Sequence, residues 1–590
     1  MYYTNGNYNA YMKPQKPKNI DGKSAYIVGA GLAGLAAAVF LIRDGQMEGK
    51  RITIFEELPV SGGSMDAILK PERGYVMRGG REMEEHFETL WDLFRSIPAQ
   101  ETPGASILDE YAWENQNDPS FSYARIIENK GQRVSDDGQL TLSQKAIREI
   151  LDLALTEEKD LQDKKINEVF TEEFFKSNFW LYWATMFAFE PWASAMEMRR
   201  YLLRFVHHIA TLSNMSALRF TKYNQYDSLI LPLETFLKEQ GVTFQYNSKV
   251  SNVIIENFGN KKTAKKILLI ENDTEKTIEL TENDLVFVTN GSITESSTYG
   301  TNTEPAPVPT EIGGSWQLWK NLAAQNSDFG RPEKFCENIP EANWVISGTI
   351  TLTDDKVIPY IEKISKKNPH SGSIVTSGPV TIKDSNWLYG YSISRQPVFK
   401  TQKSNETIVW VYGLFSDKIG NYITKKITEC NGIELCAEWL YHIGVPEKDI
   451  MDIATNYANT VPCYMPYITS YFCPRALGDR PLVVPEGSVN LAFIGNFAET
   501  EKDTVFTTEY SVRTAMEAVY QFLDIQRGVP EVFASSFDVR KLLNTLYYLN
   551  DQKSLDEIKK PLRDSILEKY VIRKIKGTYI EEIFKDEKLI

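Results

Sequence analysis

The sequence lacks the cysteine pattern of a disulfide-stabilised or zinc-binding protein. It contains five cysteines, which is an odd number, and no Cys-x-x-Cys pair occurs. Such a set predicts reduced thiols instead of a disulfide framework, and it offers no zinc-ligand spacing. Because reduced thiols are typical of the cytoplasm, we expect the protein to be cytoplasmic.

Long apolar runs and an excess of positive charge are also missing. The most apolar stretch, residues 179–189, is bounded by Lys176 and Glu190 and is too short to span a bilayer. Residues 1–22 are polar and lack the apolar run of a signal peptide. A net charge of −14 at pH 7 argues against a general nucleic-acid partner. Repeats and low-complexity tracts, which would indicate a scaffold, are absent.

What the sequence does contain is a dinucleotide-binding pattern near its N-terminus. A short apolar strand at 25–28 leads into Gly29-Ala30-Gly31-Leu32-Ala33-Gly34, and a helix over 35–45 and a strand at 52–55 follow. The first glycine permits a tight turn, the second lets a pyrophosphate approach, and the third allows close helix–strand packing. Glu56 ends the second strand, where it can accept hydrogen bonds from a ribose. A glycine-rich turn without a ligand is the alternative.

Further segments favour FAD over NAD as the dinucleotide. Ser61-Gly62-Gly63-Ser64 follows the acid, as in many two-domain flavoproteins, and residues 230–253 resemble their middle section. Residues 285–291 and 489–496 resemble the strands that return to the cofactor, and a helix over 507–523 should follow. Nothing indicates a second, NAD-binding unit. We therefore predict an α/β protein with a Rossmann-like FAD lobe built from separated segments.

The expected domain organisation follows from those segments, because the insertions between them should form the substrate lobe. A length of 590 residues fits about three structural units. The predicted divisions are an FAD-binding lobe of residues 1–140, 210–300 and 475–530, an α+β substrate lobe of residues 141–209 and 301–474, and a helical C-terminal segment of residues 531–590.

Motifs spread over nearly the whole chain are more specific than the dinucleotide pattern. They are Gly62-Gly63-Ser64-Met65-Asp66, Arg78-Gly79-Gly80-Arg81-Glu82-Met83-Glu84, Asn290-Gly291-Ser292, Arg395-Gln396-Pro397 and Phe493-Ile494-Gly495-Asn496-Phe497. Together they resemble the oleate hydratase family, once called myosin-cross-reactive antigens. The resemblance implies an FAD-dependent hydro-lyase that adds water across a cis double bond of a long unsaturated fatty acid, without net redox chemistry.

The dinucleotide pattern and the family resemblance together predict the cofactor-binding residues. The predicted set is Gly29, Gly31, Gly34, Glu56, Glu57, Ser64, Met65, Arg78, Gly79, Gly80, Arg81, Val250, Asn290, Gly291, Ser292, Asn496 and Thr507. The expected cofactor is FAD, and no metal site is expected.

Glu82 is the first residue that the resemblance implies to be catalytic. The two glycines Gly79-Gly80 predict a mobile loop beside the flavin, and Glu82 lies two residues further on. A carboxylate so placed can be moved into the site when the cofactor binds, and Glu82 matches the catalytic glutamate of the family. The alternative is a helix-start carboxylate favoured by the helix dipole.

Tyr201 matches the catalytic tyrosine of the family. An aromatic tract at 174–192 precedes it and would form either the wall of a fatty-acyl tunnel or an ordinary core. His207 and His208 follow at helical spacing and are interpreted as structural or polar-surface residues. The resemblance implies that Tyr201 protonates the alkene and Glu82 orients and deprotonates the attacking water. Since the reference pKa of tyrosine is about 10, positioning in a dry cavity must supply most of the acceleration.

Burial of the acyl chain contributes about 0.8 kcal/mol per CH₂, and this free energy changes little when the chain slides by a few carbons. The substrate carboxylate must therefore fix which carbon atoms lie at the catalytic residues. In the family a threonine and an asparagine before Arg-Gln-Pro supply this anchor, and the matching residues here are Ser392 and Ser394. With Pro379 nearby, these small residues resemble the branch that hydrates the 12,13 bond of linoleate. We therefore favour 13-hydroxylation, with 10-hydroxylation and a neutral substitution as the alternatives.

The chain from about residue 532 onward predicts helices. Lysines and arginines cluster between residues 553 and 576, interleaved with apolar residues and diluted by acids. This segment would pack on the body or on a second subunit, or contact anionic lipid. The resemblance implies a homodimer or higher homo-oligomer and peripheral contact with the inner face of the cell membrane.

Two other functions remain open on the same FAD lobe. A flavin-dependent redox enzyme or isomerase acting on fatty acids would be reduced by its substrate. A lipid-binding protein that keeps FAD only for stability would bind fatty acids without forming a hydroxylated product. The Arg-Gly-Gly-Arg-Glu-Met run favours the hydratase over both.

Overall fold

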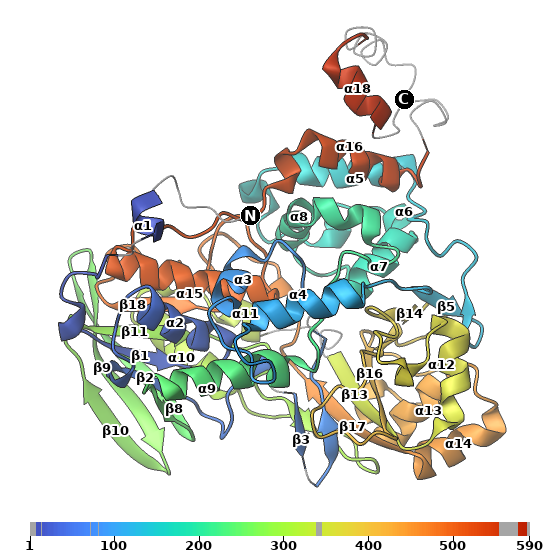
Figure 1. Cartoon of the computed structure of the whole chain (residues 1–590), viewed down its shortest axis with the longest axis horizontal. Helices are drawn as coiled ribbons and strands as arrows, with labels where there is room; N and C mark the ends of the chain where they lie inside the picture. The colour runs from blue at the N-terminus through green and yellow to red at the C-terminus, as the bar shows by residue number, and fades with distance from the viewer. Residues whose placement is uncertain are drawn as a thin grey trace.

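A five-stranded parallel sheet forms the centre of the first lobe in the computed structural model (Figure 1). Its strands, in spatial order, are β18 (Leu491–Ile494), β11 (Asp284–Thr289), β1 (Ser24–Val28), β2 (Ile52–Phe55) and β7 (Thr243–Gln245). Most of their side chains are buried, as expected for parallel strands that are covered on both faces. Numbered along the chain, the order is 5-4-1-2-3, which is the Rossmann arrangement. The predicted fold class is therefore confirmed.

The structure describes residues 8–12, 15–65, 67–70, 72–80, 82–337, 345–553 and 576–586. No helix within these ranges is both long enough and apolar enough to cross a membrane.

Helix α2 (Leu32–Arg43) is the buried helix of the dinucleotide pattern. It packs against α15 (Thr508–Leu523) and α9 (Leu231–Glu239). The helix begins earlier than the predicted 35–45, because Gly31 serves as its N-cap. An almost entirely apolar sequence with no polar face explains why α2 is buried on every side.

The three separated segments of the predicted FAD lobe meet at one edge of the parallel sheet. Gly29 follows β1, Asn290 follows β11, and Gly495 follows β18. Because the strands are parallel, their carboxyl ends lie together at the point where the strand order reverses. Residues that lie hundreds of positions apart in the sequence are thereby brought to a single crevice.

An eight-stranded, mainly antiparallel sheet forms the second lobe. Its order is β12 (Thr298–Tyr299), β17 (Ala458–Met465), β13 (Val345–Leu352), β16 (Thr407–Gly413), β15 (Tyr389–Ser392), β14 (Val380–Ile382), β5 (Ile126–Glu128) and β6 (Gln132–Arg133). Helices α12 (Ile358–Ser365), α13 (Gly432–His442) and α14 (Glu447–Asn456) share its hydrophobic core. Strands β5 and β6 join this sheet although they lie inside the range 1–140 that sequence assigns to the cofactor lobe. Short strands carry no signal for a partner so distant in the chain.

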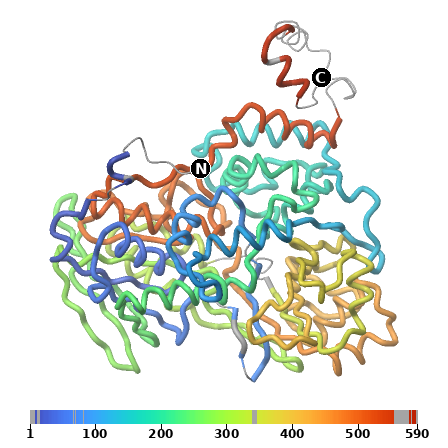
Figure 2. Tube along the Cα trace, in the orientation of Figure 1, coloured from blue at the N-terminus to red at the C-terminus, as the bar shows by residue number. Residues whose placement is uncertain are grey.

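A layer of helices lies above both sheets and contains the aromatic tract. It includes α5 (Gln144–Leu155), α7 (Asn178–Phe187), α8 (Ala195–Arg204) and α16 (Val539–Leu549), as the trace in Figure 2 also shows. Helix α16 packs on the short helix η6 (Val206–Thr211), so the C-terminal part of the chain returns to the aromatic layer. The basic stretch after Lys553 lies outside the described residues up to Lys576.

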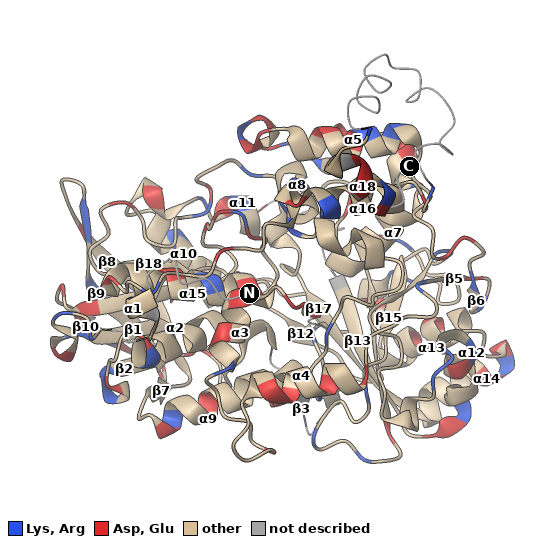
Figure 3. Ribbon diagram, turned by 45° about the horizontal axis from the view of Figure 1, so that its top comes forward, with Lys and Arg blue, Asp and Glu red and all other residues tan. Residues whose placement is uncertain are grey.

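Acidic and basic residues are interspersed over the outer elements of the two lobes (Figure 3). A smaller antiparallel sheet of β8 (Ser248–Phe258), β9 (Lys261–Glu271) and β10 (Thr274–Glu279) extends from the first lobe. Its outer strand, β10, is mostly exposed and carries both acidic and basic residues.

Candidate active site and cofactor cradle

A cavity of about 590 Å³ lies at the carboxyl ends of β1, β11 and β18, and we call it the cofactor cradle. Among the residues that line it are the predicted cofactor ligands Gly31, Ser64, Met65, Gly291, Ser292, Asn496 and Thr507. The structure thus brings together residues from all three separated segments. Of the other predicted ligands, Arg81 lies outside the described residues.

The three glycines of the dinucleotide-binding pattern are required for different structural reasons. Gly29 has a φ of 98°, which favours glycine. A Cβ at Gly34 would lie 2.0 Å from the carbonyl oxygen of Gly29, so the helix could not approach the strand. At Gly31 an added Cβ would meet nothing closer than the Cα of Gly63, at 3.8 Å. The first and third glycines therefore serve the fold, whereas the second keeps the cradle open.

The acid at the end of β2 is held by main-chain donors. Glu56 accepts hydrogen bonds from the backbone N–H of Ala30 at 2.8 Å and of Leu58 at 2.9 Å. Burial raises the pKa of its carboxyl group. Neighbouring Glu57 pairs with Lys249 at 3.5 Å, next to the buried Val250 of β8. This geometry suits an acid that faces a ribose beside the cradle.

Buried polar atoms around the cradle indicate that it is built for a polar ligand. Thr289 Oγ1, Asn290 Oδ1 and Thr508 Oγ1 are buried without a hydrogen-bond partner among the described residues. The side-chain amide of Asn290 is fixed by a 3.0 Å hydrogen bond to the carbonyl oxygen of Phe497. The N-terminus of α15, capped by Thr507, also faces the cradle and favours a negative group there. The residues present therefore fit a dinucleotide.

The loop that follows the cradle carries the second motif. The Arg78 guanidinium is buried and donates to the carbonyl oxygen of Gly63, and more weakly to that of Thr294 at 3.5 Å. Gly79 has a positive φ, and Gly80 lies on the walls of the two cavities described next. Arg78 thereby ties the loop to the rim of the cradle.

An apolar cavity of about 800 Å³ adjoins the cradle. The two share Phe506, Thr507 and Thr508, so this stretch of chain separates them. The apolar side chains on the wall are Met83, Phe87, Trp183, Met186, Phe187, Phe205, Ile209, Leu212, Met215, Ala217, Leu218 and Phe506. Part of the aromatic tract therefore lines a cavity, while Phe179 and Tyr182 lie in the core.

Glu82 lies on the wall of the apolar cavity and also on that of a polar cavity of about 560 Å³. The polar cavity contains both predicted carboxylate anchors, Ser392 and Ser394, together with Lys222 and Arg395. Glu82 is not a helix-start carboxylate, because the next helix, α3, spans Glu88–Phe94. It stands at the junction of an apolar and a polar compartment.

Pro379 is set back from that compartment. Its neighbour Gly378 lines the polar cavity, while the Pro379 carbonyl oxygen accepts a hydrogen bond from the buried Arg125 guanidinium. Pro379 therefore shapes the wall through its main chain.

Tyr201 is fully buried in α8, behind the wall of the apolar cavity. Its hydroxyl donates a 2.5 Å hydrogen bond to the carbonyl oxygen of Val505. Its ring packs edge-on against Phe187, with the ring centroids 4.9 Å apart, and Phe205 lies at 5.8 Å. Burial raises the pKa of the phenol well above its ordinary value. The described wall of the apolar cavity includes these two phenylalanines but does not include Tyr201 itself.

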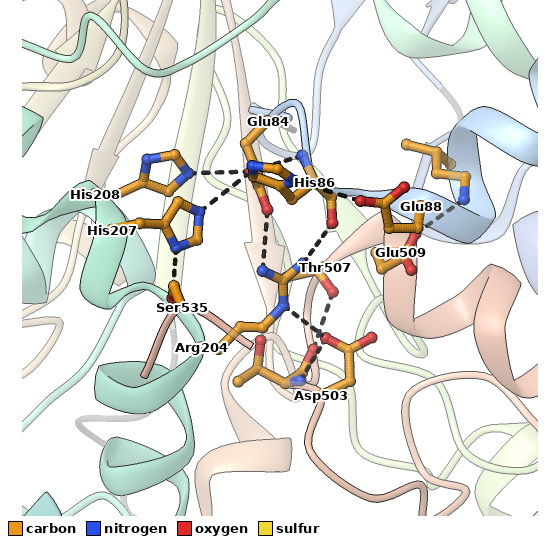
Figure 4. Close-up of polar contacts among 12 residues, drawn as sticks. Glu84, His86, Glu88, Arg204, His207, His208, Asp503, Thr507, Glu509 and Ser535 are labelled. Atoms are coloured by element: carbon orange, nitrogen blue, oxygen red, sulfur yellow. Dashed lines mark hydrogen bonds and ion pairs between the residues drawn. The ribbon is translucent and has the colours of Figure 1, made fainter. Parts of the chain in front are cut away.

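Sequence reasoning missed a group of charged and polar residues at the wall of the same cavity, whose mutual contacts are drawn in Figure 4. Glu84 and His208 both line it, and His207 and Arg204 contact Glu84. The interpretation of the two histidines as structural or surface residues did not anticipate that the side chain of His208 lies on a cavity wall. The rarity of histidine, with five in the chain, was the available signal.

Comparisons with known proteins agree with these motifs. The family model described as the MCRA family matches residues 22–520. An oleate hydratase of Streptococcus pyogenes serotype M49 (strain NZ131) is 56% identical over 592 residues, covering 100% of both chains. A linoleate hydratase of Lactiplantibacillus plantarum is 31% identical over 582 residues, covering 92% of this chain and 98% of that protein.

Solved structures give more distant matches. A cyclohexylamine oxidase from Brevibacterium oxydans IH-35A has a TM-score of 0.49 at 12% identity, and a putrescine oxidase with redesigned cofactor binding has a TM-score of 0.47 at 12% identity. Each match covers 85% of this chain and 99% of the other. Since the family model and a full-length relative both span the chain, the protein belongs to the MCRA family, the oleate hydratase family that its motifs resemble.

Proposed function

We propose that the protein is an FAD-dependent hydro-lyase that adds water to a cis double bond of long-chain unsaturated fatty acids. The observation that carries this proposal is the position of Glu82 between an apolar cavity and a polar one. A fatty acid needs both kinds of surface, because burial drives the binding of its chain and polar groups must receive its carboxylate. The names of the two relatives, an oleate hydratase and a linoleate hydratase, support the same chemistry.

FAD is the cofactor that the cradle fits. Gly31 leaves room for a pyrophosphate, Glu56 accepts a hydrogen bond from the backbone of Ala30 next to Gly31, and Asn290 and Thr508 offer buried oxygens. When bound, FAD would organise the loop beside the reaction site, and its reduced form would supply an electron-rich ring system, with no net redox change. The Gly79-Gly80 loop is the part of the chain that we expect to adjust to it.

Glu82 and Tyr201 are the proposed acid–base pair. Glu82 orients the attacking water and accepts its proton, and Tyr201 delivers a proton to the alkene. For this role the Tyr201 hydroxyl must turn from the Val505 carbonyl into the cavity, past Phe187 and Phe205. A high phenol pKa keeps the proton on Tyr201 until the alkene is in position.

Ser392 and Ser394 are the proposed anchors of the substrate carboxylate. The two cations beside them already have acidic partners: Lys222 lies 2.8 Å from Glu101, and Arg395 lies 2.8 Å from Asp118. Serine hydroxyls in a partly neutralised cavity hold a carboxylate loosely, which allows the chain to sit deeper. We therefore propose 13-hydroxylation of linoleate, with 10-hydroxylation as the alternative outcome.

The test is a product assay with oleate and linoleate, with and without added FAD. The proposal expects mass spectrometry to show the gain of one water, with the oxygen drawn from labelled water, only when FAD is present. Bleaching of the flavin by a fatty acid under anaerobic conditions would instead indicate the redox enzyme. Binding of fatty acid without any product would indicate the lipid-binding protein. Homodimerisation and contact with a membrane surface remain predictions from the family resemblance.

A further inference from the structure

A carboxylate and an imidazole face each other on the wall of the apolar cavity. His208 Nε2 lies 3.2 Å from Glu84 Oε2, and both side chains line the cavity that also contains Glu82. The other ring nitrogen of His208, Nδ1, lies on the ring edge turned away from Glu84 (Figure 4). A carboxylate at ion-pair distance from one imidazole nitrogen stabilises the protonated ring, an arrangement found beside histidine bases in many enzymes.

Glu84 is surrounded by positive and hydrogen-bond-donating groups and stays ionised. Its carboxylate accepts the backbone N–H of His86 at 2.8 Å and lies 3.1 Å from Arg204, which in turn lies 3.3 Å from Asp503. Burial opposes ionisation of Glu84, but the charge of Arg204 and the contacts with His207 and His208 outweigh it and hold the pKa well below its ordinary value. Glu84 is thus a fixed negative charge, and an ionised carboxylate is acceptor-only.

The two neighbouring histidines differ in what their far nitrogens meet. His207 Nδ1 lies 2.9 Å from the Ser535 hydroxyl, and the His207 ring packs edge-on against Phe533. His208 instead lines the cavity. The charge of Glu84, 3.2 Å from His208 Nε2, favours a proton on that nitrogen, which leaves Nδ1 of a neutral His208 able to accept one.

The ligand atoms of Glu84, His207 and His208 lie within 4.8 Å of one another, which is also a spacing that a metal ion could use. The Arg204 guanidinium beside Glu84 already supplies the positive charge that a cation would bring. Glu84 Oε2 is moreover occupied by the backbone donor of His86. The cluster is therefore better suited to carrying a proton than to holding a metal.

We propose that His208, held by Glu84, is the proton relay that resets Glu82 in the hydration reaction. The inference rests on the proposed function. As the C–O bond forms, one O–H bond of the attacking water breaks, and its proton passes to Glu82. Through a cavity water, that proton then moves to Nδ1 of His208, and Glu84 balances the charge of the resulting imidazolium. The proton finally returns through water to the acid that protonated the alkene, so a cycle consumes one water and no net proton.

The apolar wall explains why such a relay is needed. Apart from Glu82, the titratable side chains on the described wall are Glu84 and His208. Glu84 is committed to Arg204 and to its backbone donor, so it cannot exchange protons freely. On the polar side of Glu82, Lys222 and Arg395 already pair with Glu101 and Asp118, so His208 is the group on the apolar side that can accept its proton.

The experiment separates the first turnover from the later ones. In His208→Ala, the product of a single turnover should form at nearly the wild-type rate, while kcat should fall by about 100-fold. Free imidazole should restore part of kcat. His208→Gln keeps an amide donor for Glu84 but carries no proton, so it should show the same split.

His442→Ala is the matched control. His442 Nε2 also lies 3.2 Å from a buried carboxylate, that of Glu438, but the pair belongs to α13 in the second lobe. This variant should keep wild-type single-turnover and steady-state rates per folded protein. Thermal unfolding of each variant shows whether the loss of the pair harms the fold.

Three outcomes would overturn the inference. An unchanged kcat in both His208 variants would do so, and so would an equal loss of first-turnover rate and kcat without imidazole rescue. Wild-type protein that forms no hydroxylated product would overturn both the inference and the proposed function. Hydration by the wild type with unaffected His208 variants would overturn the inference alone.

The protonation state gives a readout that does not depend on turnover. The chain contains five histidines, so ¹⁵N-histidine labelling yields few signals, and the His208 variants assign the one in question. The inference expects His208 to be the tautomer protonated at Nε2. A proton on Nδ1 in the neutral ring would contradict it.

Discussion

The hydroxyl of Tyr201 donates its hydrogen bond to the main-chain carbonyl of Val505, immediately before the stretch that separates the cofactor cradle from the apolar cavity. The proposed acid, Tyr201, is therefore hydrogen-bonded next to residues 506–508, the partition between the two cavities, and does not itself line the apolar cavity. A change at the cradle that moves residues 505–508 would release this hydroxyl. Cofactor binding and acid function can thereby be coupled through a single contact.

Replacement of Tyr201 by phenylalanine should remove the acid while retaining the ring packing. We expect kcat to fall by at least about 100-fold and the free energy of unfolding to drop by about 1 kcal/mol. Tyr510→Phe is the control, because Tyr510 is another buried phenol and donates at 2.6 Å to the carbonyl oxygen of Ala498. It should lose similar stability and keep its turnover. Wild-type turnover in Tyr201→Phe would refute the assignment.

Replacement of Glu82 by glutamine should nearly abolish hydration, because an amide cannot accept the proton of the attacking water. FAD binding, measured by flavin absorbance after gel filtration, should remain. Glu85→Gln is the control, because Glu85 belongs to the same loop but its exposed side chain pairs with Arg219 outside the proposed site. That variant should hydrate normally. Loss of FAD in Glu82→Gln would mean that the Glu82 carboxylate is needed for FAD binding in the cofactor cradle.

Alanine at two fingerprint glycines should separate ligand binding from folding. Gly31→Ala adds a methyl group with no neighbour closer than 3.8 Å, so the fold should persist while the cradle is filled. Gly34→Ala drives its methyl group to 2.0 Å from the Gly29 carbonyl oxygen, so the protein itself should be destabilised. Thermal unfolding and FAD titration of the two variants measure this difference. Full FAD affinity in Gly31→Ala would argue against a pyrophosphate at this position.

The double variant Ser392→Thr with Ser394→Asn should shift any 13-hydroxylated linoleate product towards the 10-hydroxylated one. Longer side chains on the polar cavity would hold the carboxylate higher and bring a nearer double bond to Glu82. Chromatography with mass spectrometry of the products gives the ratio. A ratio that does not change would remove the two serines from the carboxylate site. Only 10-hydroxylated product from the wild type would remove the preference for the 12,13 bond.

Because of His207, we expect the free energy of unfolding to decrease as the pH falls below neutral. Burial lowers its pKa to about 4 in the folded protein, whereas the unfolded chain binds the proton near the reference value of about 6.5. Between these two values the unfolded state holds the extra proton, so stability is full above this window and declines as pH falls through it. The decline contributed by His207 is up to about 3 kcal/mol. Urea unfolding across this range should show a weaker pH dependence in His207→Gln than in wild type, whereas the exposed His370→Gln should not alter it.

The fold of the cofactor lobe was readable because its signals are local. Glycines, a buried helix and two short apolar strands follow one another within the segment 25–56, and the structure repeats that order. The return strands at 284–289 and 491–494 were recognisable for the same reason. The pairing of β5 with β14 joins segments more than two hundred residues apart, and short strands do not encode their partners.

The site was predictable only in part. Glu82 and the serine pair line one cavity, and the motifs are local enough to single out each of them in the sequence. The seclusion of Tyr201 was not predictable, because it depends on rings from α7 and on a carbonyl three hundred residues away. The contact between Glu84 and His208 likewise arises from tertiary packing, and neither residue carries a local signal for it.

The partition between the two cavities is held in an unfavourable backbone state. Phe506 has a φ of 75°, a region that bulky residues rarely adopt and that costs about 1–3 kcal/mol. Its amide is pinned at 3.0 Å by the side-chain oxygen of Asn496, on the floor of the cradle. We therefore expect that a ligand which withdraws Asn496 from this amide would let Phe506 return to an ordinary backbone conformation and would open a passage between the two cavities.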